Sequence, residues 1–287
     1  MNKPRLFFDT NILETLASSP LYERVRKYLS ARYTYVISPL TVDELLLGIK
    51  GGDEQFFDRN QAKMKVLRGV GQMRILRPPA TFVLKQVLGV HVNPPTASVV
   101  EIEKCIDVVL RAHSKGQLEQ GLVPLRNSRK TGGLNFDPIE QRHNWGKAEH
   151  ARILESLRAK ELRKPKPNEW VKTSFRHFNL ELADSEWSKV ASALDAAVAL
   201  NLHLCDLSAG DRYDFSRHHS DWIDLHQLFY LCDPNVSFLT NDKPLRNRVA
   251  KSDQSDQIGR IVMLEDILRT VTEQTALGSS GEVEPNI

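Results

Sequence analysis

The chain has 287 residues, of which 41% are hydrophobic and 26% charged, enough for one large or two small domains with a substantial core. This composition excludes an intrinsically disordered chain, and the net charge of +3 permits a nucleic-acid partner without requiring one. Three distant cysteines without a CxxC pair argue against a zinc site and indicate buried free thiols. No apolar run approaches the roughly 18 residues of a membrane span. We therefore expect a cytoplasmic protein without membrane contact.

The first third of the chain alternates predicted strands with predicted helices. The strands are short apolar, β-branched or aromatic runs, and turn or cap signals bound the helices, such as Ser38-Pro39 before one helix and Gly51-Gly52 after it. The expected elements are a strand over Leu6–Phe8, a helix from about Ile12 to Leu29, a strand over Tyr33–Ile37, helices over Leu40–Ile49 and Glu54–Val70, and a strand over Arg74–Leu76.

A long middle section, residues 80–215, has little strand character, and the α/β alternation returns after it. The elements expected from the middle section onward are helices over Thr96–Ala112, Asp137–Arg163, Ser185–Leu204 and Asp221–Leu231, strands over Val236–Leu239 and Ile261–Met263, and a helix over Leu264–Thr272. Strands that alternate with helices indicate an α/β fold with a parallel sheet. We therefore expect a discontinuous core of residues 1–79 and 216–272, a mainly helical insertion or subdomain at 80–215, and a flexible tail at 273–287.

Acidic side chains fall at informative places in this predicted architecture. Asp9 and Asp242 follow strands whose carboxyl ends would meet at one edge of the sheet, where ligand sites form in parallel sheets. Glu44 lies near the buried stripe of its helix, and Asp224 abuts the apolar stripe of another, with Asp221 on the same face. Each acid alone has an ordinary explanation, such as a helix cap for Asp9 or a turn for Asp242. Together they predict a repelling cluster that a divalent cation would relieve, and oxygen ligands suit Mg²⁺ or Mn²⁺.

Four strings, FFDTN, SPLTVDELLLG, DWIDLHQLFYL and FLTNDKPL, resemble in motif and in order those of the PIN-domain family of nucleases. The resemblance covers roughly residues 3–76 and 218–270, and it implies an α/β/α sandwich with a central parallel sheet, to which the helical section is an addition. The residues that match the four acids of the family are Asp9, Glu44, Asp224 and Asp242. The polar neighbours Asn11 and Thr240 match as well.

The resemblance implies a metal-dependent nuclease that hydrolyses phosphodiester bonds, with RNA favoured over DNA, as in endoribonucleases of the toxin or defence type. The implied ligands of one or two Mg²⁺ or Mn²⁺ ions are Asp9, Asp221, Asp224 and Asp242, with Asp221 additional to Asp224 or a substitute for it. Glu44 would bind metal or orient the attacking water, while Asn11 and Thr240 would hold Asp9 and that water. Two kinds of protein partner are left open: a protein inhibitor or antitoxin, and further copies of the same chain in a homo-oligomer.

The middle section also carries a basic stretch. From Arg126 to Lys172 the chain has 12 Lys and Arg against 6 Asp and Glu, with Trp145 and Trp170 among them. Cations for phosphates and aromatic rings for stacked bases would suit a single-stranded nucleic acid, although a solvated helix with its aromatic side chains in the core explains the same pattern. The cations expected to contact nucleic acid are Arg158, Lys160, Arg163 and Lys164.

Two other interpretations stay open. An α/β phosphatase of the haloacid-dehalogenase type also places an Asp after its first strand, but it needs a second acid where this chain has Asn11. A non-catalytic PIN-like module that binds nucleic acid or protein would not need all four acids. His218, His219 and His226 lie near the acids in the sequence, and a loop or surface position is the favoured interpretation for them.

Overall fold

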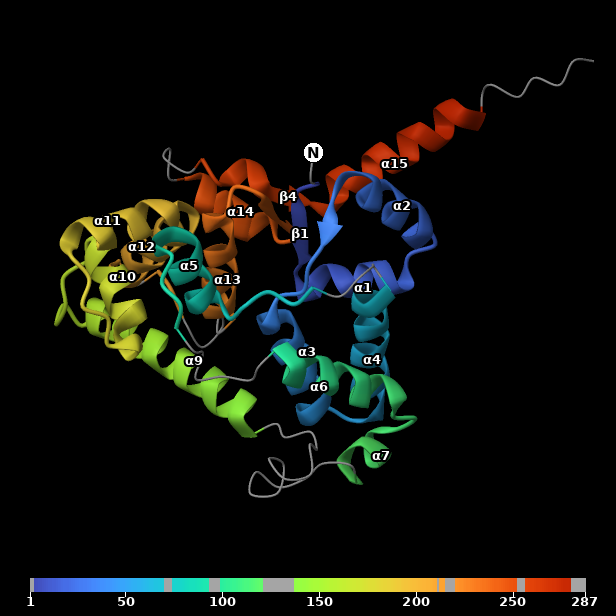
Figure 1. The fold of residues 1–287 in the computed structure, drawn as a ribbon, viewed down its shortest axis with the longest axis horizontal. Coiled ribbons are helices and arrows are strands. Elements are labelled where there is room, and N and C mark those ends of the chain that lie inside the picture. Colours follow the sequence, from blue (N-terminus) through green and yellow to red (C-terminus); the bar gives the residue numbers. More distant parts are fainter. Residues whose placement is uncertain are drawn as a thin grey trace, which may run out of the picture.

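The structure is a computed structural model, and it describes residues 3–69, 74–92, 99–120, 137–210, 212–214, 220–251 and 256–279. Most of these residues are helical, and four short parallel strands form one sheet in the order β2-β1-β3-β4 (Figure 1). The strands are β1 (Arg5–Phe8), β2 (Thr34–Tyr35), β3 (Val236–Thr240) and β4 (Ile261–Met263). The mixed α/β class and the parallel sheet expected from the sequence are confirmed.

The strand register brings the carboxyl ends of β1 and β3 together. The two strands pair along all of β1, with Phe8 opposite Leu239, while β2 pairs with β1 on its other side. The order of strands therefore reverses between β1 and β3, and ligand sites in open parallel sheets form at such a point. The third strand expected over Arg74–Leu76 appears only as a single parallel bridge between Ile37 and Ile75.

The helices of the first third are α1 (Thr10–Ser18), α2 (Tyr22–Arg32), α3 (Pro39–Gly51) and α4 (Glu54–Gly69). The single helix expected from Ile12 to Leu29 is wrong, because the chain breaks at Ser19, which is extended with a ψ of 128°. Pro20 explains the break, since a proline disfavours the helical conformation in the residue before it. The start of α3 is as expected, with Ser38 Oγ accepting a hydrogen bond from the backbone N–H of Leu40 at 3.2 Å.

The middle of the chain folds into α5 (Pro79–Leu88), α6 (Val99–Arg111), α7 (Lys115–Gln120), α9 (Asp137–Arg158), α10 (Pro167–Phe175), the 3₁₀ turn η1 (Arg176–Phe178), α11 (Asp184–Ala193) and α12 (Asp195–Ala209). The helix expected over Ser185–Leu204 is instead α11 and α12, bent by 89°, and no proline or glycine marks that bend. Helix α9 ends at Arg158, earlier than expected. Within the described residues, no single helix is both long and apolar enough to cross a membrane, and only the bent pair α11 and α12 would pass such a test together.

The last part contains α13 (Asp221–Gln227), η2 (Leu228–Cys232), α14 (Lys243–Ala250), η3 (Ile258–Arg260) and α15 (Leu264–Ser279). Helix α15 continues past Thr272 into the segment expected to be a flexible tail, and residues 280–287 lie outside the described part. The three cysteines are free thiols, with Cys205 buried and Cys105 and Cys232 partly buried.

Two buried clusters cover the two faces of the sheet. Side chains alternate along a strand, so Leu6 and Phe8 of β1 enter one cluster while Phe7 enters the other. The cluster around Leu6 and Phe8 takes apolar side chains from α1, α2, α3, α4, α6, α7 and α15. The cluster around Phe7 takes them from α5, from α9 to α14 and from η2. The middle section, expected to be an insertion or subdomain, therefore contributes to both clusters.

Candidate active site

Asp9 follows β1 at the carboxyl edge of the sheet, and its carboxylate is held by two side chains. Its Oδ2 accepts hydrogen bonds from Thr240 Oγ1 at 2.6 Å and from Asn11 Nδ2 at 2.7 Å. Asp9 stands at the N-cap position of α1, but its side chain makes no capping hydrogen bond, so helix capping does not explain it. With 5% of its surface exposed, this carboxylate is fixed at the end of the sheet by the two polar residues singled out in the sequence.

Asp242 stands beside this pair at the end of β3. The backbone N–H of Asp242 donates to Thr240 Oγ1 at 3.0 Å, and Asn11 Oδ1 accepts from the backbone N–H of Asn241 at 3.2 Å. Thr240 and Asn11 thus join the ends of the two strands. The Oδ1 of Asp242 accepts from the backbone N–H of Leu245 at 2.7 Å and caps α14, which leaves Oδ2 outside the cap.

Helix α3 carries Glu44 to the same edge. The helix is anchored to β1 because Thr41 Oγ1 donates to the carbonyl of Phe8 at 2.8 Å. Thr10 Oγ1 lies 3.2 Å from Glu44 Oε2 and 3.4 Å from Asp9 Oδ1, so one hydroxyl bridges the two carboxylates. Burial, and then the charge of Asp9, raise the pKa of Glu44 to about 8.

Asp224 of α13 completes the cluster. Burial raises the pKa of Asp224 well above its ordinary value, and nearby carboxylates raise it further, namely those of Asp9, Glu44, Asp242 and Asp221. The pKa of Asp9 is also raised, first by burial and then by the charge of Asp242, against the lowering effect of its hydrogen bonds. The four acids expected to be catalytic therefore lie within electrostatic reach of one another.

Asp221, three residues earlier on α13, has a different environment. Its Oδ2 accepts from Tyr213 Oη at 2.8 Å and forms an ion pair with Arg248 Nη1 of α14 at 2.8 Å. Burial and the charge of Asp221 raise the pKa of Tyr213, so this phenol stays a hydrogen-bond donor. Asp221 thus has a counter-charge from the protein and ties α13 to α14.

The donor set fits a divalent cation in kind. Carboxylate and hydroxyl oxygens are the ligands that Mg²⁺ and Mn²⁺ prefer, and acids that raise one another's pKa are stabilised by a cation between them. In the described part of the chain, no three His, Cys, Asp or Glu side chains already converge closely enough to hold one ion.

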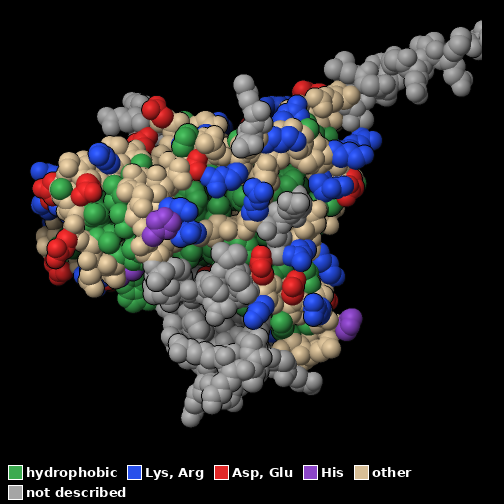
Figure 2. Space-filling view, viewed as in Figure 1, with side chains coloured by type: hydrophobic (Ala, Val, Ile, Leu, Met, Phe, Trp, Pro, Cys, Tyr) green, Lys and Arg blue, Asp and Glu red, His purple; other side chains and the backbone are tan. Residues whose placement is uncertain are grey.

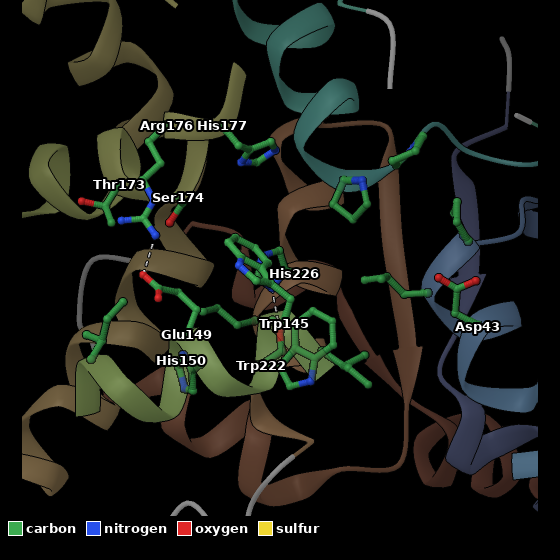
Figure 3. A pocket seen from close by; sticks show the side chains of 18 of the residues that line it. Asp43, Trp145, Glu149, His150, Thr173, Ser174, Arg176, His177, Trp222 and His226 are labelled. Carbon is green, nitrogen blue, oxygen red and sulfur yellow. Dashed lines mark hydrogen bonds and ion pairs between the residues drawn. The ribbon is translucent and has the colours of Figure 1, made fainter. Parts of the chain in front are cut away.

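A cavity of about 560 Å³ lies beside the carboxylates, between α3, α5, α9, α10, η1 and α13 (Figure 3). Glu44 belongs both to the carboxylate cluster and to the cavity wall. Ile223 and Leu225, the residues on either side of Asp224, also line the cavity. Much of the remaining wall is formed by the rings of Trp145, Trp170, Trp222, His150, His177 and His226. A Cβ atom at Gly146 would lie 2.8 Å from the Trp222 ring, so a glycine is required for this close approach of α9 to α13.

The cavity changes the interpretation of the histidines. His226 is half-buried in the cavity wall, so the expected loop or surface position is wrong for it. His218 and His219 lie outside the described residues.

The sequence motifs also did not single out Thr10 and Arg248. The position of Thr10 inside FFDTN was a usable signal, whereas only tertiary structure pairs Arg248 with Asp221.

The four cations expected to contact nucleic acid lie at the end of α9 and just after it. Arg163 pairs with Glu169 at 2.6 Å and Lys164 with Asp206 at 2.7 Å, while Arg158 donates to the backbone carbonyl of Tyr213. Lys160 is exposed. On the face shown in Figure 2, Lys and Arg side chains are spread over several elements and mixed with acidic ones.

No protein-family model, no curated protein and no solved structure matches the chain.

Proposed function

We propose that the protein is a metal-dependent nuclease of the PIN type that hydrolyses phosphodiester bonds. The observation that carries the proposal is the gathering of Asp9, Asp242 and Glu44, which hydrogen bonds through Thr240 and Thr10 hold together. This cluster stands where the strand order reverses, at the carboxyl ends of β1 and β3. Carboxylates that repel one another lower the stability of the folded protein, so their gathering at one edge of the sheet indicates a positively charged ligand that offsets the repulsion. A divalent cation is that ligand.

The topology supports a PIN-like α/β/α sandwich as the fold. The parallel order β2-β1-β3-β4 is extended beyond β2 by the bridge at Ile75, and buried clusters with helices cover both faces of the sheet. The acids of the four sequence motifs lie on the elements that the resemblance implies: after β1, in α3, in α13 and after β3.

A bound Mg²⁺ or Mn²⁺ would activate water and offset negative charge on the phosphate. Asp9, Asp224 and Asp242 would hold it, and Thr240 and Asn11 keep Asp9 in position. Glu44 would bind the ion or orient the attacking water. Asp221 is better suited to fixing α13 against α14, because its Oδ2 is engaged by Arg248 and Tyr213. The preference for RNA, and for a toxin or defence role with a protein inhibitor, rests on the sequence resemblance alone.

Incubation with labelled RNA and DNA panels, with Mn²⁺ or with EDTA, tests the proposal. Cleavage is expected only with metal, and Asp9→Asn, Asp224→Asn and Asp242→Asn should each abolish it. Asp58→Asn, at an exposed acid of α4, is the matched control and should cut like the parent. Full cleavage by any two of the three site variants would contradict the proposal.

A non-catalytic module that binds nucleic acid or protein is the second candidate. Such a module would bind nucleic acid equally well with and without metal and would leave it intact. A haloacid-dehalogenase-type phosphatase is disfavoured because Asn11 donates to Asp9 where a second acid is needed. That enzyme would form an aspartyl-phosphate, visible by mass spectrometry after reaction with a small phosphoester.

A further inference from the structure

The cavity beside the carboxylates has no role in the chemistry described so far. Its volume of about 560 Å³ lies within the range of roughly 300–1,000 Å³ that is typical of small-molecule sites. We propose that it binds one unpaired base of the nucleic acid that the carboxylates cut, so that the substrate is single-stranded at that nucleotide. This inference rests on the proposed nuclease function and adds a substrate class to it.

The position of the cavity favours a nucleotide over an unrelated ligand. Glu44 forms part of its wall, and Ile223 and Leu225 place the wall directly on both sides of Asp224. A phosphodiester held at the carboxylates has its base only one sugar away. That base would therefore lie at the cavity, and a base paired in a duplex could not enter.

The walls offer aromatic rings to a planar ligand. Trp145 of α9 is 58% exposed, one of three large hydrophobic side chains that remain exposed in the described part, so burial in the core does not explain it. Its ring lies 6.5 Å from that of His177, and the Trp222 ring lies 5.3 Å from that of His226. Aromatic side chains stack on any base, because every base has a π-face.

The charged side chains of the walls favour a neutral ring over a phosphate as the buried group. Asp43, Glu44 and Glu149 line the cavity against a single cation, Arg176, within the described residues. Arg176 is already paired with Glu149 at 2.8 Å, as the dashed line in Figure 3 marks. A phosphate in the cavity would meet three acidic side chains and one arginine that is already paired, whereas a base carries no charge. The backbone of the nucleic acid therefore stays at the mouth.

His226 supplies a hydrogen-bonding group for the base. Its Nδ1 lies 2.7 Å from the carbonyl of Trp222 and so carries the proton that it donates there. With Nδ1 engaged by this carbonyl, Nε2 is the ring nitrogen left to accept a hydrogen bond from a ligand. An N–H group of a base would be its donor.

Tryptophan fluorescence tests the proposal directly, because Trp145, Trp170 and Trp222 all line the cavity. The full chain is titrated in EDTA, so that binding is measured without cleavage. The probes are the four ribonucleosides, ribose 5-phosphate, and one oligonucleotide as a single strand and as a duplex. Saturable quenching is expected with the nucleosides and the single strand, and no saturable quenching is expected with ribose 5-phosphate or the duplex.

Substitution of the exposed tryptophan locates the site. Trp145→Ala should weaken nucleoside and single-strand binding roughly tenfold or more, the loss expected when a stacking side chain is removed. Trp145→Phe should keep most of the affinity, because the ring is retained. Phe56→Ala, at an exposed aromatic of α4 outside the cavity, is the matched control and should bind like the parent.

Cleavage assays separate this proposal from the nuclease proposal. With Mn²⁺, Trp145→Ala should raise KM for a single strand more than it changes kcat. Metal-dependent cleavage with no nucleoside binding and an unchanged KM in Trp145→Ala would overturn the base site and leave the nuclease standing. Nucleoside binding without cleavage would support the base site and contradict the nuclease. Binding of N-acetylphenylalaninamide but of no nucleoside would assign the cavity to an aromatic side chain of a protein partner and overturn the proposal.

Discussion

Asp221 and Asp224 lie three residues apart on one short helix, yet their carboxylates have different electrostatic surroundings. Asp221 is neutralised by Arg248 and hydrogen-bonded by Tyr213, whereas Asp224 faces other carboxylates. The sequence shows two acids on one helical face and does not distinguish them. The structure separates a residue that holds two helices together from one that needs an external cation.

Neutralising these two acids should therefore change the stability of the metal-free protein in opposite directions. Asp224→Asn should raise the free energy of unfolding by roughly 1 kcal/mol, because it removes a half-buried acid that repels the neighbouring carboxylates when it is ionised. Asp221→Asn should lower it by about 2 kcal/mol, because Arg248, whose side chain is 21% exposed, loses its partner. Urea unfolding in EDTA measures both. Two shifts of the same sign would contradict the assignment of their roles.

The raised pKa of Glu44 makes the metal-free stability depend on pH. The folded protein keeps a proton on Glu44 up to a pKa of about 8, whereas the unfolded chain releases it near the ordinary value of 4.5. The stabilisation is thus complete below about pH 4.5 and is lost as the pH rises through about 8. The pKa values of Asp9 and Asp224 are also raised and act with the same sign.

Thermal unfolding in EDTA from about pH 5 to pH 8 should therefore show a falling melting temperature, with Glu44 contributing at most about 1.4 kcal/mol per pH unit. Glu44→Gln should flatten the profile, because the variant has no carboxyl group to titrate at this position. A melting temperature that rises across this window in the parent would rule out a cluster of carboxylates that repel one another.

At the scale of elements, α9 links the candidate site to the outer helical layer. Around Trp145 and Gly146 it lines the cavity against α3 and α13, and farther along it packs on α12. Burial lowers the pKa of Lys147, and the nearby carboxylate of Glu44 partly offsets this effect. Arg163 and Lys164, just past the other end of α9, are paired with Glu169 and Asp206.

Lys147→Gln should weaken binding of single-stranded RNA in EDTA and reduce the slope of log K against log salt by about 1, because a cation beside the carboxylates would neutralise one phosphate. A second variant changes the cations expected from the sequence, Arg158, Lys160, Arg163 and Lys164, to Gln. It should weaken RNA binding less than Lys147→Gln does, because two of these cations are already paired with acids. If this combined variant weakened binding more than Lys147→Gln did, the nucleic-acid surface would lie at the end of α9.

The elements recovered from the sequence are those with strong local signals. β1 and β3 are apolar runs, and α3 has a serine cap followed by proline, so their ends could be placed and the acids after them assigned to one edge. Local signals failed at prolines that begin helices: Pro79 and Pro167 open α5 and α10, although in the sequence they resemble helix-ending punctuation. The cavity could not be predicted, because its wall comes from helices whose relative placement no local pattern encodes.

At the scale of the whole molecule, the middle section is part of the core. The side chains of Phe7 and Phe238, on one face of the sheet, are buried in the same cluster as Val198 and Leu200 of α12. The sequence shows the section as a break in the α/β alternation, which suggested an insertion. Its apolar side chains form much of the buried cluster on one face of the sheet.

A chain in which a short linker replaces residues 80–215 should therefore not fold cooperatively, because one face of the sheet would lose most of its apolar cover. Dispersed amide signals in its NMR spectrum and a sharp unfolding transition would contradict this expectation. They would show that the middle section is an independent insertion.

The most direct test of the central claim, that the carboxylates at the ends of β1 and β3 form a metal site, is calorimetric titration of the purified protein with Mn²⁺. The account predicts saturable binding of one or two ions to the parent and to the control Asp58→Asn, and loss of that binding in Asp9→Asn. Absence of binding in the parent, or equal binding by all three proteins, would contradict it.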